Sequence, residues 1–170
     1  MGKLAKLMRL TLDSTRSHFM VLADEVDMLD QYAALCQLRY GDFSWNVEVD
    51  EELDLYETKL PPMMLQPIVE NAVQHAVRPN LNAGKDAVVS LHFESHEVGL
   101  QVVIIDNGPG MKSDAATSEG SHGLSILLER LELLSKKYGT RFELATESTE
   151  GEGSNTGTRV SLILGTDALE

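Results

Sequence analysis

The fold is decided by the stretch LPPMMLQPIVENAVQH, residues 60–75. Two prolines open it, and apolar side chains then recur at helical spacing over residues 65–76, within one arc of about 140°. The opposite arc holds polar residues, namely Gln66, Glu70, Asn71, Gln74 and His75. The pattern predicts an amphipathic helix that ends at Arg78-Pro79-Asn80. Pro67, about one turn in, predicts a slight kink.

Outward from this helix, the chain alternates between helical and strand patterns. Helical spacing recurs over residues 2–18, 22–40 and 123–138. Strand patterns occupy residues 43–49, 88–94, 98–106, 141–146 and 158–164. A long segment, residues 107–122, has no periodicity, and loops of this length in a compact domain are usually functional or disordered. Because successive strands without intervening helices form antiparallel hairpins, the order predicts an α+β fold rather than a doubly wound one.

Composition excludes several classes of function. The chain has 170 residues, of which 42% are hydrophobic and 24% charged, which is enough for one core. Its formal net charge of -13 repels a phosphate backbone, so nucleic-acid binding is not expected. A single nucleotide remains compatible, because magnesium and backbone N–H groups can hold its phosphates. No apolar run reaches the ~18 residues that span a bilayer, and Cys36 is expected to be a buried, reduced thiol.

The polar face of the predicted helix carries the first candidate site. Glu70 and Asn71 are adjacent, and His75 lies one turn beyond Asn71. The plain interpretation is an ordinary solvated face. The alternative is that the Asn71 amide oxygen binds magnesium, which takes few protein ligands, while the Glu70 carboxylate acts on an attacking group.

Two glycine-containing segments carry the other candidates. Asp106 ends an apolar strand before Asn-Gly-Pro-Gly, and either caps a turn or accepts a hydrogen bond from an exocyclic amine of a flat ring. Residues 120–124, Gly-Ser-His-Gly-Leu, enter a helix, either as a plain junction or as a phosphate site with free N–H groups. They match neither the P-loop nor the Rossmann glycine pattern.

Together these segments resemble the GHKL ATPase superfamily, and within it the catalytic and ATP-binding part of LytS-type sensor histidine kinases. Residues 60–75 are similar to the N box of that family, and Asp106-Asn107-Gly108-Pro109-Gly110-Met111 is similar to its G1 box. Further landmarks are similar at Arg130-Leu131, Tyr138-Gly139 and Gly157-Thr158. The segment from Leu22 to Asp42 resembles the part of those kinases that precedes the ATPase.

The resemblance implies a fold and a division of the chain. The fold is the Bergerat type, a two-layer α/β sandwich whose mixed sheet is covered by helices on one face, with an N-terminal helical arm. Residues 1–42 are expected to be a helical linker or dimerisation remnant, residues 43–165 the ATP-binding catalytic domain, and residues 166–170 a tail.

The resemblance also implies roles for individual residues, with ATP and Mg²⁺ as cofactors. Catalysis would involve Glu70, Asn71 and His75, with Asn71 holding the magnesium. ATP would be bound by Asn71, Asp106, Gly108, Gly110, Gly120, Gly123, Leu124 and Thr158. From its position, Lys112 is expected to screen phosphate charge, and residues 112–121 are expected to form a mobile lid.

Two departures from the family pattern bear on function. The second glycine box carries fewer glycines than usual, which predicts a weaker lid. His18 lies in Ser-His-Phe without the preceding Pro or the nearby Asn of a phosphoacceptor, so we interpret it as a surface or packing histidine. The acceptor histidine is therefore expected outside this chain.

The resulting prediction is the cytoplasmic, ATP-binding catalytic part of an inner-membrane sensor histidine kinase. It would transfer the γ-phosphoryl group to a histidine on another segment and would not autophosphorylate alone. Its expected partners are that acceptor segment, a response regulator and, in the full protein, a second copy as a homodimer. The alternative is a non-catalytic nucleotide-sensing or scaffold domain of the same fold.

Overall fold

The computed structural model describes residues 19–110, 120–150 and 156–165. The elements are, in order, β1 (Met20–Val21), α2 (Leu22–Tyr40), β2 (Ser44–Val49), β3 (Lys59–Leu60), α3 (Gln66–Ala72), the π-helical turn η1 (Val73–Val77), α4 (Arg78–Asn82), β4 (Val88–His96), β5 (Gly99–Asp106), α5 (Gly120–Tyr138), β6 (Phe142–Glu150) and β7 (Thr156–Gly165). The predicted helix over residues 2–18, Lys112 and most of the predicted lid lie outside the described residues.

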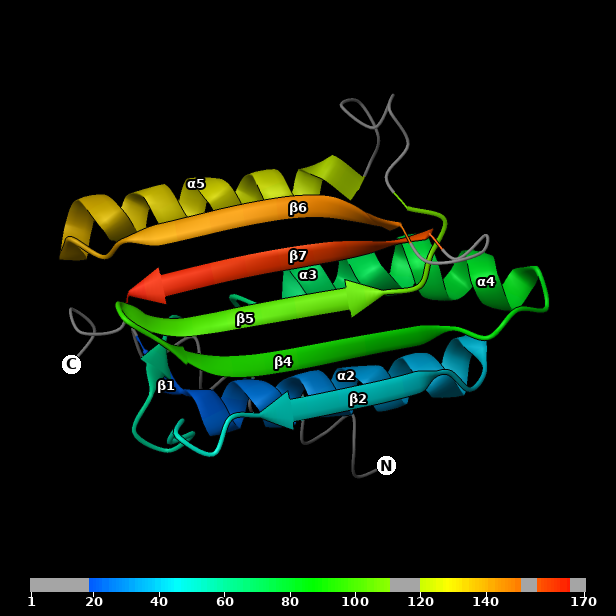
Figure 1. Ribbon diagram of the computed structural model, residues 1–170, viewed down its shortest axis with the longest axis horizontal. Coiled ribbons are helices and arrows are strands. Elements are labelled where there is room, and N and C mark those ends of the chain that lie inside the picture. Colours follow the sequence, from blue (N-terminus) through cyan, green and yellow to red (C-terminus); the bar gives the residue numbers. More distant parts are fainter. Residues whose placement is uncertain (1–18, 111–119, 151–155, 166–170) are drawn as a thin grey trace.

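Five strands form one mixed sheet in the order β2-β4-β5-β7-β6. β2 runs parallel to β4, and every other neighbouring pair is antiparallel. Figure 1 shows α2, α3 and α5 together on one face of this sheet. This confirms the predicted two-layer α+β architecture with helices on a single face. A separate two-stranded ladder pairs β1, which immediately precedes α2, with β3, which lies between β2 and α3.

The core lies between the sheet and the helical layer. Alternate residues of the strands face it, as in the row Phe93, Val102 and Leu162, because successive side chains of a strand point to opposite faces. Helix α2 belongs to the same core, since Leu22, Leu29, Ala33 and Cys36 are buried in the cluster that contains the sheet residues. Cys36 is a free, buried thiol, as predicted.

The helix predicted from residues 60–75 is present, but it ends later than predicted and buries one more residue. Its predicted apolar face is buried, but the helix does not end at Arg78-Pro79-Asn80, because η1 and α4 continue it to Asn82. Pro79 lies at the start of α4 and Pro67 at the start of α3, where a missing N–H breaks no intrahelical bond. The wide π turn also brings Val77 onto the buried face, which the α-helical spacing did not predict.

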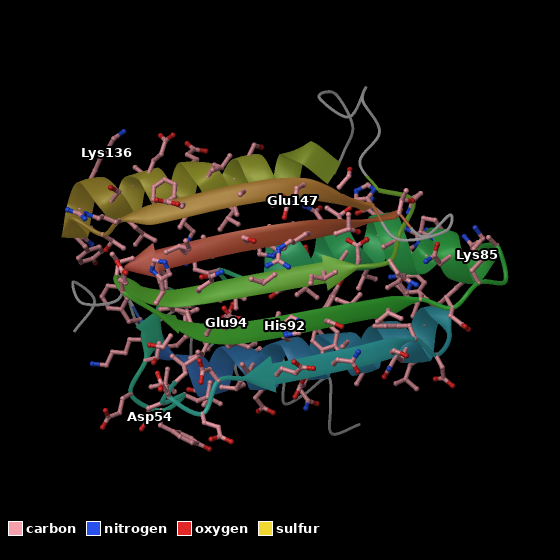
Figure 2. The ribbon with its side chains drawn as sticks, in the orientation of Figure 1. Asp54, Lys85, His92, Glu94, Lys136 and Glu147 are labelled. Atoms are coloured by element: carbon pink, nitrogen blue, oxygen red, sulfur yellow. The ribbon has the colours of Figure 1, made fainter. Side chains whose placement is uncertain are left out.

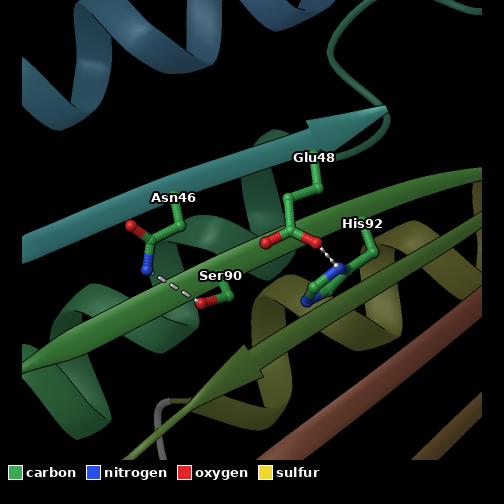
Figure 3. Close-up of polar contacts among 4 residues, drawn as sticks. All are labelled: Asn46, Glu48, Ser90 and His92. Carbon is green, nitrogen blue, oxygen red and sulfur yellow. Dashed lines mark hydrogen bonds and ion pairs between the residues drawn. The ribbon is translucent and has the colours of Figure 1, made fainter. Parts of the chain in front are cut away.

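The other face of the sheet is polar and lacks a helical cover in Figure 1. Figure 2 places His92 and Glu94 of β4 and Glu147 of β6 on this face. In Figure 3, Asn46 Nδ2 donates to Ser90 Oγ at 3.2 Å, and His92 Nδ1 lies 3.1 Å from Glu48 Oε2. These contacts cross the parallel pair β2–β4, and as exposed pairs they stabilise it only slightly. Among the described helices, none has the length and apolarity that a membrane-spanning segment needs.

Candidate functional site

Asp106 occupies the last position of β5, opposite Thr158 of β7. It follows Val102 and Ile104 on the side of the sheet that faces the helices, so its carboxylate lies at the edge of the core. Its Oδ1 accepts hydrogen bonds from the backbone N–H groups of Gly108, at 2.9 Å, and Thr158, at 3.2 Å. Within the described part of the chain Oδ2 accepts no hydrogen bond, so the backbone holds one carboxylate oxygen and not the other.

Burial dominates the electrostatics of this carboxyl group. Removal from water raises the pKa of Asp106 above its ordinary value, and the two backbone hydrogen bonds oppose that rise. The charge of His75, an exposed residue of η1, also lowers the pKa, which places the imidazole within electrostatic reach of Asp106. Two separately predicted site residues, His75 and Asp106, therefore lie within electrostatic reach of each other, although they are 31 positions apart in the sequence.

Glycines around Asp106 allow close backbone packing. A Cβ at Gly108 would lie 2.5 Å from the Cβ of Ala76, so only glycine lets the chain leave β5 against η1. A Cβ at Gly157 would collide with the carbonyl oxygen of Asp106. Gly110 has a φ of 73°, in the left-handed region. These glycines therefore let η1 and β7 pack closely against the backbone at the end of β5.

A network of amide groups fixes the end of β5, and the sequence pattern did not single it out. Asn107 Oδ1 accepts hydrogen bonds from Val88 N–H at 2.8 Å and from Asn80 Nδ2 at 3.1 Å. Asn80 Nδ2 also lies 2.9 Å from the carbonyl oxygen of Asn107, and Asn80 is buried. The network ties α4 to the adjoining ends of β4 and β5. The sequence feature that could have indicated this network is the polar residue Asn80 within the helical run.

Asn71 forms the second part of the site, beside the first turns of α5. A Cβ at Gly123 would lie 3.7 Å from Asn71 Oδ1 and 3.9 Å from the Cβ of Pro67. The buried Asn71 Nδ2 has no hydrogen-bond partner in the described structure. Buried polar atoms are nearly always paired, so among the described residues the Asn71 amide is an exception, with a donor that has no acceptor.

The helical run α3–η1 joins the two parts. Asn71 faces the start of α5, and Ala76, five positions later, packs against Gly108 below Asp106. Gly120 is the first residue of α5, which begins three residues before the predicted helix start at Gly123. Leu124 is partly buried against the core, and Thr158 is partly buried opposite Asp106.

Glu70 does not share the environment of Asn71. Its Oε1 accepts a hydrogen bond from Gln66 Nε2 at 2.7 Å. The Glu70 side chain lines a small cavity between α2 and α3–η1, together with Tyr32, Tyr40, Val73, Gln74 and Arg78. Burial raises the pKa of the Tyr32 hydroxyl, and the negative charge of Glu70 raises it further. The adjacent residues Glu70 and Asn71 therefore lie on different sides of the helix.

Comparison with protein families finds two matches. Residues 61–167 match the family described as histidine kinase-, DNA gyrase B-, and HSP90-like ATPase. Residues 1–44 match the family described as histidine kinase. The first match contains every predicted site residue and the sheet strands β4 to β7.

Known proteins agree with these matches. The sensor histidine kinase/phosphatase LytS of Staphylococcus aureus is 30% identical over 155 residues, which cover 86% of this chain and 26% of LytS. The chain thus spans about a quarter of the length of that relative.

Solved structures share the fold at low sequence identity. The histidine kinase domain of a blue-light activated histidine kinase from Erythrobacter litoralis has a TM-score of 0.59 at 18% identity, with 96% of this chain and 73% of that chain covered. The catalytic domain of the histidine kinase ThkA, in a nucleotide-free form, has a TM-score of 0.57 at 15% identity, with 86% and 94% covered.

Proposed function

Because this chain belongs to the family of histidine kinase-, DNA gyrase B-, and HSP90-like ATPases, we propose that it is the ATP-binding catalytic part of a sensor histidine kinase. It transfers the γ-phosphoryl group of ATP to a histidine on a segment outside this chain. The rest of a longer receptor supplies that histidine, a membrane anchor and a dimer interface, and a response regulator accepts the phosphoryl group next. The observation that carries the proposal is the half-satisfied Asp106 carboxylate among close-packed glycines.

Adenine recognition is assigned to Asp106. Its Oδ1 is held by the Gly108 and Thr158 amides, so Oδ2 is oriented to accept a hydrogen bond from the exocyclic amine of adenine. A charge-assisted bond of this kind is stronger than a neutral one. In this proposal Gly108 and Gly110 form the adenine edge and the lid hinge, and the Thr158 N–H of β7 supports the carboxylate.

Phosphate binding is assigned to the start of α5 and to Asn71. The first four N–H groups of a helix lack intrahelical partners, and Gly123, in the first turn of α5, lies beside Asn71. The Asn71 Oδ1 atom is a hard oxygen ligand suited to Mg²⁺, which neutralises phosphate charge when bound. One protein ligand suffices, because Mg²⁺ keeps several waters and binds the phosphate oxygens as well.

Catalysis is proposed to rest on positioning and electrostatics, as is usual in phosphoryl transfer. Glu70 and His75 are both exposed on the helix that carries Asn71, where an incoming acceptor segment would meet them. In this proposal Glu70 orients or deprotonates the attacking histidine, and His75 contributes charge near Asp106.

A non-catalytic nucleotide-sensing domain is the second candidate. One observation favours it, which is that the Glu70 carboxylate is bonded to Gln66 in the cavity beside α2 rather than beside Asn71. In this case the site binds nucleotide without transferring phosphate.

Calorimetry with ADP and ATP, with and without magnesium, tests nucleotide binding. Asp106→Asn should weaken binding about tenfold or more, because one carbonyl oxygen cannot serve both the backbone amides and the adenine amine. Glu94→Gln, an exposed carboxylate on the open face, is the matched control and should bind as the wild type does. Wild-type affinity in Asp106→Asn would reject the adenine assignment.

Asn71→Ala should mainly remove the magnesium dependence of nucleotide binding.

Phosphoryl transfer separates the two candidates. The same chain is assayed within a full-length receptor, with radiolabelled ATP as the donor. If the domain is catalytic, Glu70→Gln should lose most of the transfer while keeping ADP affinity. Nucleotide binding with no transfer in the wild-type receptor would favour the sensing domain.

A further inference from the structure

Glu25 is a buried carboxylate that the proposed nucleotide site does not use. It lies in the first turn of α2, and only 1% of its surface is exposed. Its Oε2 accepts a hydrogen bond from Met63 N–H at 2.8 Å, and its Oε1 accepts one from Leu65 N–H at 2.9 Å. A buried glutamate is rare unless its oxygens are paired, and here both are paired with backbone donors.

These two donors belong to the start of the helix that carries Asn71. Leu65 immediately precedes α3 and provides no side-chain cap of its own. The N–H groups at a helix start lack intrahelical partners, and a negative charge there is favourable to the helix dipole. Glu25 therefore performs the capping function from another element, 40 positions earlier in the chain.

The backbone at Met63 requires external support. Met63 has a φ of 58°, and it is the one non-glycine residue with positive φ among the residues that the structure describes. A methionine in this region is strained, and such a conformation persists where surrounding contacts hold it. The hydrogen bond from Met63 N–H to Glu25 is such a contact.

A third element, α5, is linked to the same carboxylate. The positive charge of Arg130 opposes the rise in the Glu25 pKa that burial causes, and the Glu25 charge in turn opposes the fall in the Arg130 pKa that burial causes. Arg130 lies about two helical turns after Gly123, the residue beside Asn71. Glu25 thus interacts with the starting segment of α3 and with the α5 helix that forms the other wall of the site.

We propose that Glu25 is a positioning residue, which fixes α3 so that Asn71 lies against the start of α5 and thereby couples α2 to nucleotide binding. The inference rests on the proposed function for its nucleotide readout. The β1–β3 ladder adds to the coupling, because the chain entering α2 pairs with the strand that leads to Met63. A displacement of α2 would therefore reach Asn71 by two routes, the hydrogen bonds of the Glu25 carboxylate and the backbone ladder between β1 and β3.

The test begins with Glu25→Gln in this chain. A glutamine keeps the size, but its single oxygen accepts only one of the two N–H groups, and its NH₂ group faces the other donor. Hydrogen exchange should accelerate about tenfold or more at Met63 or Leu65 and in the first turn of α3. The Asn71 side-chain amide resonance should shift. Asp24→Asn, an exposed carboxylate of the same turn, is the matched control and should change neither readout.

A second comparison separates positioning from general loss of stability. Leu29→Ala removes buried apolar surface from the same helix and lowers the melting temperature, but it keeps the Glu25 carboxylate that accepts from Met63 and Leu65. At a temperature where both variants are folded, Glu25→Gln should lower ADP affinity by about tenfold, and Leu29→Ala should stay within about twofold of wild type. Arg130→Gln combined with Glu25→Gln should lower the affinity by less than the product of the single effects.

The exchange measurement needs no nucleotide, so the two proposals fail separately. Accelerated exchange confined to the start of α3, with a shifted Asn71 amide, supports the positioning role even if the wild type binds no ADP. Wild-type exchange at both Met63 and Leu65 in Glu25→Gln overturns it even if ADP binds. An affinity loss no larger than that of Leu29→Ala overturns the coupling to nucleotide binding.

Discussion

Single residues at the end of β5 combine a destabilised charge with tight backbone packing. Asp106 is partly desolvated, and its pKa is raised although two backbone amides stabilise its ionised form. Gly108 packs on Ala76 at a distance that no other residue type permits. Burial of the Asp106 carboxylate costs stability, which is usual for titratable groups arranged around a ligand, whereas the close packing at Gly108 requires glycine.

The raised pKa of Asp106 predicts a pH effect on stability. Between the unfolded value near 3.8 and the higher folded value, the native state binds more protons than the unfolded state, so the Asp106 contribution to stability falls as pH rises. Relative to Asp106→Asn, the nucleotide-free wild type should therefore gain stability as the pH falls from neutral toward the unfolded value near 3.8. Urea unfolding at several pH values measures the difference. A difference that is constant, or that shrinks on acidification, would contradict the burial-dominated environment.

Gly108→Ala should destabilise the domain. The new Cβ would meet the Ala76 Cβ at 2.5 Å, and overpacking of this kind typically costs about 1–3 kcal/mol. Gly123→Ala is the matched control, because its Cβ makes only ordinary contacts and alanine favours a helix by up to about 1 kcal/mol. In thermal unfolding, the melting temperature of Gly108→Ala should lie below that of the wild type. The melting temperature of Gly123→Ala should equal or exceed that of the wild type. The reverse order would refute the close approach of η1 and the Gly108 backbone.

Among the elements, the helical run α3–η1–α4 organises the site. Its first part presents Asn71 to α5, its π turn packs on Gly108, and its last part holds Asn80 against the end of β5. The π turn alters the helical phase in mid-run, and such turns are frequent at functional sites. Because of this change of phase, one helical run can contact α5, the Gly108 backbone and the end of β5.

Asn80→Ala should loosen the junction of α4 with β4 and β5. It removes donors to the Asn107 and Asp86 carbonyl oxygens, and a buried acceptor left unpaired costs about 1–3 kcal/mol. Asn82→Ala, an exposed residue of the same helix, should be nearly neutral. Denaturant unfolding and exchange at Val88 N–H, which bonds to Asn107, measure the effect. Equal stability of the two variants would show that the amide network is dispensable.

The whole molecule carries a large negative field. With a net charge of -13, it repels free ATP at distances beyond the binding contacts. The Debye length falls from about 30 Å at 0.01 M salt to about 8 Å at 0.15 M, so salt screens this repulsion. The short-range contacts at Asp106 and at the start of α5 are screened less.

Magnesium-free ATP should therefore bind several-fold more tightly at 0.15 M than at 0.01 M monovalent salt, as roughly expected for screened like charges. Adenosine, which has no phosphate charge, is the control and should show little salt dependence. Calorimetry or a fluorescent competitor gives both affinities. An ATP affinity that weakens with salt would mean that positive groups at the site outweigh the field of the whole chain.

Local sequence determined much of this protein. The apolar spacing of residues 65–76 predicts the buried face of α3, because helical periodicity acts over a few residues. The strand patterns likewise predict where β4, β5 and β7 lie along the chain. The four motif segments together identify the family, and they mark Asn71 and Asp106, which the fold then places at either end of one helical run.

Tertiary structure alone decided how these pieces meet. It placed β7 between β5 and β6, so that Thr158 bonds to Asp106 across 52 positions, and it turned Glu70 away from its neighbour Asn71. It also brought the Glu25 carboxylate to Met63 and Leu65. Strand order and long-range capping depend on burial and register summed over the whole core, which no local pattern records. The sequence alone predicts that Glu25, in an acidic first turn of a helix, is exposed to solvent. Glu25 is buried only because α2 packs against the start of α3.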